Sequence, residues 1–184
     1  MNQSKAFSRR RVDWPIVGFF LINLLVITYI VDLEQLVIAD ASNFTYPLWP
    51  PAFMVDAVHT YGHAFDPLVI ARPVWWKATI WLDALAFGPF YAVALYAYVK
   101  GRNWIRIPSI IYSAMLFTVV FIILSEELFG PSAAPQPAVV LALNAPWLLM
   151  PIYIIARMWR SPSPFQQPAA AARAAPEPAM RADR

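Results

Sequence analysis

The feature that most constrains this chain is the recurrence of long apolar runs. Each run has close to the ~20 residues that an α-helix needs to cross the hydrocarbon core of a bilayer. The third run carries no charged residue, and the second carries only Asp83. The sequence therefore predicts four membrane-spanning helices, in the apolar runs Trp14–Val31, Ile80–Val99, Ile107–Leu124 and Ala138–Ala156.

The composition agrees with lipid as the main solvent. Of the 184 residues, 60% are hydrophobic and only 14% are charged, against about 25% charged residues in soluble domains. The chain has no cysteine, which excludes disulfides and thiolate metal sites. No basic face is interleaved with aromatic residues outside the apolar runs, so nothing indicates binding to nucleic acid.

The first apolar run follows Arg9, Arg10 and Arg11, as the apolar part of a signal peptide would. It is longer than the usual ~7–15-residue core of a signal peptide. No small-x-small cleavage site follows it. An uncleaved membrane anchor is therefore the better interpretation.

Lysine and arginine gather on one side of the predicted bundle. Of the 14 such residues, twelve lie before the first run, between the second and third, or after the fourth. Only Arg72 and Lys77 fall on the opposite side. Under the positive-inside rule, four spans then place both termini in the cytoplasm. We expect the endoplasmic reticulum if the host is a eukaryote and the inner membrane if it is a bacterium.

We expect one all-α membrane domain, a four-helix bundle with short interfacial helices in the long loop between the first two spans. That loop, from about Glu34 to Pro73, mixes aromatic residues with prolines. The tail from Ser161 is rich in Pro, Ala and Arg and is expected to be disordered. The expected segments are residues 1–11, a membrane domain 12–160 with spans at about 14–33, 74–99, 106–127 and 137–159, and the tail 161–184.

Ionisable residues inside spanning helices usually mark function, because each costs at least ~2.5–3.5 kcal/mol on insertion. Asp83 lies nine residues after Val74, about 13 Å below the far-side interface. Asp32 ends the first run on the same side of the membrane. Thr28 and Thr79 lie one helical turn before these two aspartates.

The fourth run adds polar groups at a similar depth. Asn144 and Trp147 are three residues apart and therefore share a helix face. Three helices thus direct polar side chains to one level, which predicts a single polar pocket in an apolar bundle. The alternatives are that Asp32 is a solvated helix end, that Asn144 serves helix packing, and that Trp147 is an ordinary core or lipid-facing aromatic.

Other ionisable residues are expected to have ordinary roles. His59 and His63 are four apart, as zinc ligands on a helix can be, but no third ligand or HExxH pattern accompanies them, so no metal site is predicted. Glu126 and Glu127 are expected to face water at the end of the third span.

Two neighbouring carboxyl groups in a low-dielectric pocket cannot both ionise cheaply, so one keeps its proton. Such a pair can bind a cationic amine or a hydroxyl. It can also donate a proton to an alkene and stabilise the resulting carbocation. Trp147 suits either task, because the face of its ring attracts a cation.

Several motifs, in order along the chain, resemble the EXPERA family over about residues 12–161. The resemblance implies a four-helix membrane bundle with both termini cytoplasmic. The motifs are Phe65-Asp66-Pro67-Leu68, Pro73 to Lys77, Asp83, Gly88-Pro89, Tyr98 to Gly101, Trp104 to Ser113 and Ala145 to Pro151.

The resemblance implies that Asp32 and Asp83 are the acidic pair facing each other in the family's ligand cavity, and that Asp66 has a structural role. Asn144 and Trp147 look like residues of the family's sterol isomerase branch. Thr28 stands where that branch has a histidine and the receptor branch a threonine. Position 83 holds Asp where the family has Glu, which shortens the side chain by one methylene.

The sequence therefore favours a membrane protein that binds a sterol, a terpenoid or a cationic amphiphile. The alternative is a double-bond isomerase or cyclase. Asp83 or Asp32 would then donate the proton, the other carboxylate and Trp147 would stabilise the cation, and Asn144 would orient the acid or a hydroxyl. A lipid-trafficking or scaffold role is a third class. No cofactor is expected, and a homodimer stays open.

Overall fold

The computed structural model describes residues 7–166, and the regular elements in this part of the chain are helices. Within these residues, four helical stretches are long and apolar enough to cross a membrane. The predicted all-helical four-span bundle is thus confirmed. The four stretches are Arg11–Val37, Val74–Lys100, Asn103–Phe129 and Pro137–Trp159.

The first two spans are each assembled from several helical segments. The first joins η2 (Arg11–Asp13), α1 (Trp14–Ile22), the π-helical segment η3 (Asn23–Asp32) and α2 (Leu33–Val37). The second joins α5 (Val74–Leu82), the π-helical segment η4 (Asp83–Phe87) and α6 (Gly88–Lys100).

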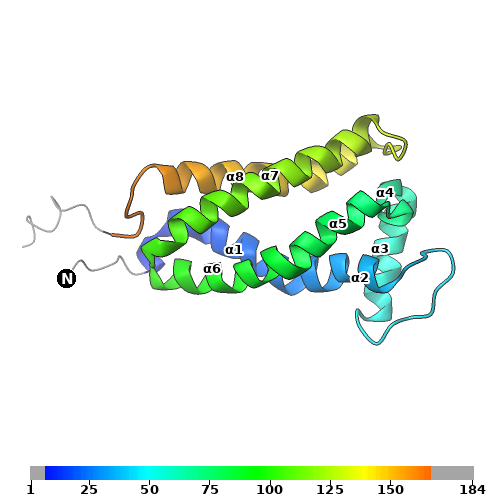
Figure 1. Cartoon of the computed structure of the whole chain (residues 1–184), viewed down its shortest axis with the longest axis horizontal. Helices are drawn as coiled ribbons and strands as arrows, with labels where there is room; N and C mark the ends of the chain where they lie inside the picture. Colours follow the sequence, from blue (N-terminus) through cyan, green and yellow to red (C-terminus); the bar gives the residue numbers. More distant parts are fainter. Residues whose placement is uncertain (1–6, 167–184) are drawn as a thin grey trace, which may run out of the picture.

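The last two spans form an antiparallel hairpin. The third comprises η5 (Asn103–Ile105) and α7 (Arg106–Phe129), and the fourth is α8 (Pro137–Trp159). In Figure 1, α7 and α8 lie along each other, α1 lies beside α6, and α2 lies beside α5. The predicted loop helices are present as α3 (Ala52–Ala64) and α4 (Pro67–Ala71), which cover one end of the bundle.

Buried polar contacts tie the basic segments together at the opposite end. Arg10 donates hydrogen bonds to the carbonyls of Tyr98 (2.6 Å) and Val99 (3.1 Å). Arg106 donates to the carbonyl of Met158 at 2.9 Å. Residues 7–13, 98–106 and 157–166 therefore share one end, here called the basic end. The end covered by α3 and α4 is called the far end.

The segment after α8 folds back on the basic end. Phe165 is fully buried there, in contact with the guanidinium groups of Arg10 and Arg157 and edge-on to Tyr98. The tail that the sequence predicts to be disordered begins at Ser161. Its first residues, 161–166, are part of the described structure and pack against the basic end. Its remainder, residues 167–184, lies outside the described residues.

The π-helical segment η4 follows from Gly88-Pro89. Proline has no backbone N–H and its ring clashes with the carbonyl four residues earlier, so a regular α-turn cannot form there. The N–H of Gly88 instead reaches the carbonyl of Asp83. In this register the carbonyl of Ala84 lacks the donor that Pro89 would supply, and the hydroxyl of Tyr29 donates to it at 3.2 Å.

Gly88 also lets the first two spans approach each other closely. A Cβ at this position would lie 2.5 Å from the Tyr29 hydroxyl and 3.1 Å from Cγ2 of Thr28. Asp32 is the last residue of η3, and Asp83 is the first of η4. Both acidic residues thus lie in π-helical segments. Such segments are rare in proteins, and those that occur are often found at functional sites.

The half of the bundle next to the basic end, the basic half, has an aromatic core. Phe20 is fully buried and packs edge-on against Phe90, Tyr98 and Tyr112. Large flat rings fill this half. The far half, next to the far end, contains the cavity described below.

Candidate ligand-binding cavity

A cavity of about 250 Å³ lies in the far half of the bundle. A cavity that holds one buried water needs only ~10–15 Å³, so this cavity is large enough for an organic molecule. All four spans and the cap helices contribute to its wall, which is mostly apolar. Five predicted site residues line it: Asp32, Thr79, Asp83, Asn144 and Trp147.

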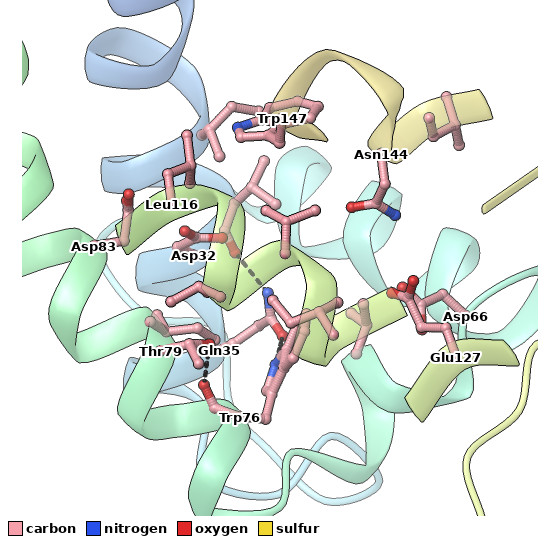
Figure 2. Close-up of a pocket in the computed structure, with 18 of the residues that line it drawn as sticks. Asp32, Gln35, Asp66, Trp76, Thr79, Asp83, Leu116, Glu127, Asn144 and Trp147 are labelled. Carbon is pink, nitrogen blue, oxygen red and sulfur yellow. Dashed lines mark hydrogen bonds between the residues drawn. The ribbon is translucent and has the colours of Figure 1, made fainter. Parts of the chain in front are cut away.

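Asp32 and Asp83 lie at one end of this cavity, and their carboxyl groups are close enough to interact (Figure 2). The Tyr91 hydroxyl donates to Oδ1 of Asp83 at 3.1 Å, and the Tyr112 hydroxyl donates to that of Tyr91 at 3.2 Å. The other Asp83 oxygen, Oδ2, has no hydrogen-bond partner among residues 7–166. The two aspartates are called the inner pair.

Thr28 is the one predicted ligand-binding residue that does not line the cavity. It is fully buried close to Asp83, on the side that packs against Gly88. Its hydroxyl makes no hydrogen bond of ordinary geometry within the described chain. Thr28 therefore lies close to Asp83 but does not line the cavity.

Trp147 is held in one orientation by the first span. Its indole N–H donates to Oδ1 of Asn23 at 2.8 Å, and its ring meets Phe19 edge-on. Asn23 is itself fixed, because its side-chain amide donates to the carbonyl of Phe19 at 2.8 Å. Asn144 donates to the carbonyl of Val140 at 3.1 Å in its own helix. These bonds leave the indole ring as part of the cavity wall.

A second acidic pair lies at the other end of the cavity. Figure 2 shows Asp66 and Glu127 next to each other, far from Asp32 and Asp83. The expectation that Glu127 faces water is wrong, because this residue is 1% exposed and lines the cavity. Glu126 instead accepts a hydrogen bond from the backbone of Ser132 at 3.1 Å. We call Asp66 and Glu127 the outer pair.

Helical phase distinguishes these two glutamates. Leu124 lies three residues before Glu127, and Val120 and Leu116 follow at further steps of four residues. All three are buried in the core. Residues at this spacing share one helix face. The sequence thus contained a signal for the burial of Glu127 that hydropathy alone does not show.

Asp66 both caps a helix and lines the cavity. Its Oδ1 accepts a hydrogen bond from the N–H of Leu68 at 3.1 Å and so caps α4. Burial raises the pKa of its carboxyl group above the ordinary value. Asp66 also lines the cavity beside Glu127.

Gln35 and Trp76 form a polar section of the wall that the sequence did not single out. The indole N–H of Trp76 donates to Oε1 of Gln35 at 2.7 Å, and Gln35 donates to the carbonyl of Val31 at 3.3 Å. The hydroxyl of Thr79 donates to the carbonyl of Trp76 at 2.8 Å. Because these polar groups bond to one another or to nearby carbonyls, they need no hydrogen bond from a ligand.

A buried ionic cluster outside the cavity fixes the cap helices. Arg72 donates to both carboxylate oxygens of Glu34 at 2.9 Å and to the carbonyl of Ile38 at 2.6 Å. His59 lies 2.8 Å from the same carboxylate. His63 is exposed. Within residues 7–166, no group of three potential metal ligands occurs.

The fold and the cavity define a polytopic helical membrane protein with an acidic cavity between its spans. The chain belongs to the EXPERA family (EXPanded EBP superfamily), which matches residues 53–158. The family predicted from the sequence motifs is thus confirmed.

The chain is similar to the protein named Sigma intracellular receptor 2 in two vertebrates. It is 32% identical to that of Xenopus tropicalis over 168 residues, which cover 85% of this chain and 93% of the relative. It is 30% identical to the Homo sapiens protein over 169 residues, which cover 84% of this chain and 91% of the relative.

Proposed function

We propose that this protein binds a sterol or terpenoid-like molecule inside the membrane, with the polar end of the ligand at the inner pair. The observation that carries this proposal is Oδ2 of Asp83, which has no hydrogen-bond partner within residues 7–166 and lies at the end of an apolar cavity. A buried acceptor without a partner costs free energy that a ligand donor recovers. The receptor names of the relatives support binding as the primary activity.

A hydroxyl or an amine is the chemistry that fits the inner pair. An ammonium group forms charge-assisted hydrogen bonds with a carboxylate, and a hydroxyl can donate to one aspartate while accepting from the protonated other. Tyr91 already occupies Oδ1 of Asp83 and orients that carboxyl group. The ligand class is therefore a sterol, a terpenoid alcohol or a cationic amphiphile.

The membrane orientation is part of the proposal. The positive-inside rule assigns the basic end, and with it both termini, to the cytoplasm. The far end then faces the lumen of the endoplasmic reticulum in a eukaryotic host or the periplasm in a bacterium. Labelling that found Lys100 and the C-terminal tail on opposite faces of the membrane would contradict this topology.

The decisive experiment on binding replaces Asp83 by asparagine. The amide keeps the shape of the side chain and accepts from Tyr91, but it offers no charge to a cation. We expect Asp83→Asn to abolish binding of a hydrophobic amine, such as a steroid with one amine on ring A. Asp56→Asn is the matched control, because Asp56 is exposed on α3 outside the cavity. If the wild type and Asp83→Asn bind the amine equally well, Asp83 does not contact the ligand.

A second candidate function is a double-bond isomerase or cyclase. The observation in its favour is the Trp147 ring, fixed by Asn23 in the wall of a cavity that contains paired carboxyl groups. In this reaction the protonated aspartate gives its proton to an alkene carbon, and the resulting cation is stabilised by the other carboxylate and Trp147. Asn144 orients the acid or a substrate hydroxyl. Loss of a proton from the neighbouring carbon then restores the acid.

Trp147→Leu separates the two functions. If a carbocation forms, turnover of a sterol falls about tenfold or more while affinity changes only a few-fold, because the cation exists only along the reaction path. If the protein only binds, affinity falls and no shifted double bond is found by mass spectrometry. Affinity and turnover that fall in step through occupancy contradict a cation-stabilising role of Trp147.

A further inference from the structure

The outer pair is not used by the function proposed above, although it faces the same cavity. Both side chains are nearly inaccessible from outside, with Glu127 1% and Asp66 3% exposed. Oε2 of Glu127 has no hydrogen-bond partner in the described part of the chain. A buried carboxyl oxygen without a partner is uncommon in folded proteins and calls for an explanation.

The cavity is elongated between the two pairs. On α7 its wall extends from Leu116 to Glu127, which is about 16 Å at 1.5 Å per residue. Val119, Val120 and Ile123 make up the α7 wall between these ends. Gln35, the polar residue between the pairs on the first span, is already bonded to Trp76. The middle of the cavity therefore suits an apolar body. At its two ends, Oδ2 of Asp83 and Oε2 of Glu127 have no hydrogen-bond partner among residues 7–166.

We propose that the cavity binds an elongated, rigid apolar ligand that carries a hydrogen-bond donor, a hydroxyl or an amine, at each end. One donor reaches Asp32 and Asp83, as the proposed function requires, and the second reaches Glu127 beside Asp66. Asp66 is already engaged through Oδ1 as the cap of α4, so the second contact falls to Oε2 of Glu127, which has no partner within residues 7–166. The outer pair thus selects ligands by length and by the presence of a second polar group.

Two steroid probes test this proposal. One carries a single amine on ring A, and the other carries a second amine at the opposite end of the same skeleton. Because the skeletons are equally rigid, the ratio of their affinities isolates the second amine. In the wild type we expect the diamine to bind about tenfold more tightly, as for one additional hydrogen bond to a charged group.

Substitutions then assign the second contact. Glu127→Gln is expected to reduce the affinity ratio of diamine to monoamine to about one, because an amide cannot form an ion pair with the second ammonium group. Glu126→Gln is the matched control, since this neighbour bonds to Ser132 and does not line the cavity. Its affinity ratio should equal that of the wild type. Elution volume and thermal midpoint in detergent report whether each variant folds.

The outcomes separate this inference from the function on which it rests. If neither probe binds the wild type, the proposed function fails. If the monoamine binds through Asp83 but the diamine has no advantage, the outer pair is not a ligand contact and only this inference is overturned. The same holds if the diamine keeps its advantage in Glu127→Gln.

Discussion

The buried carboxyl group of the basic half and those that line the cavity of the far half differ in their partners. In the basic half, Asp13 is fully buried and bonds Arg10 at 2.6 Å and Arg157 at 3.0 Å, so its charge is compensated. In the far half, one oxygen each of Asp83 and Glu127 has no partner within residues 7–166. The spans are long and apolar in both halves. Hydropathy therefore does not distinguish structure from function here, whereas the pairing of the carboxyl groups does.

The aromatic rings show the same contrast. Around Phe20 they pack edge-on against its ring. In the far half, the indole N–H groups of Trp76 and Trp147 donate to Gln35 and Asn23, and both residues line the cavity. A native fold usually departs from complete packing and pairing where it has a function.

The largest expected effect tests this contrast directly. Asp13→Asn removes the carboxylate that both Arg10 and Arg157 contact and should destabilise the protein by about 3 kcal/mol. Asp83→Asn should change stability little, because the amide still accepts from Tyr91 and removes a buried acid. Thermal unfolding in detergent, followed by tryptophan fluorescence, measures both variants. A larger loss in Asp83→Asn than in Asp13→Asn contradicts the contrast.

Gly88→Ala tests the packing that positions the inner pair. The added methyl group would displace Tyr29 from the carbonyl of Ala84 and should cost about 1–3 kcal/mol. Because Asp83 begins the same π-helical segment, affinity for the ring-A aminosteroid should fall as well. Gly18→Ala is the control, since nothing lies within 4 Å of a Cβ there. If Gly88→Ala binds the aminosteroid as tightly as the wild type does, the packing at Gly88 does not position the inner pair.

The smallest expected effect concerns the pH dependence of stability. Burial raises the pKa of Asp66, so the folded state holds this proton more tightly than the unfolded state. Its stabilising contribution is present at low pH and is lost as pH rises from the ordinary carboxyl pKa of about 4 through the raised value. Asp66→Asn keeps a capping side chain and should flatten this decline, with a gain below about 1 kcal/mol at neutral pH.

Asp40→Asn provides a control of opposite sign for the pH experiment. Hydrogen bonds from Ser42 lower the pKa of the Asp40 carboxyl group. Its stabilising contribution is therefore present at neutral pH and lost as pH falls through the lowered pKa, so its removal changes the slope of the stability curve only in acid. A stability curve of Asp66→Asn with the same slope as that of the wild type contradicts the raised pKa of Asp66.

The sequence predicted the features that depend on composition and order. Apolar length indicated the four spans, and the Lys and Arg distribution indicated which segments share an end. Helical spacing brought Asp32, Asp83 and Trp147 to one level, and the structure places all three in one cavity. Their roles in binding or catalysis stay predictions.

The remaining features depend on contacts between distant segments or on helical phase. Trp76 meets Gln35 across 41 positions, and Trp147 meets Asn23 across 124. No local pattern indicates such partners. Glu127 was misplaced because a hydropathy average treats it like Glu126, whereas only their phase on α7 separates a buried position from a partly exposed one.

A structure of the protein bound to the ring-A aminosteroid tests the central claim most directly. The claim is that the cavity between the spans is a ligand site whose polar end is the inner pair. We expect the amine nitrogen within about 2.7–3.2 Å of a carboxylate oxygen of Asp32 or Asp83, with the steroid body against Trp147 and the α7 wall. A steroid bound at the lipid-facing surface, with the cavity empty, would contradict the claim.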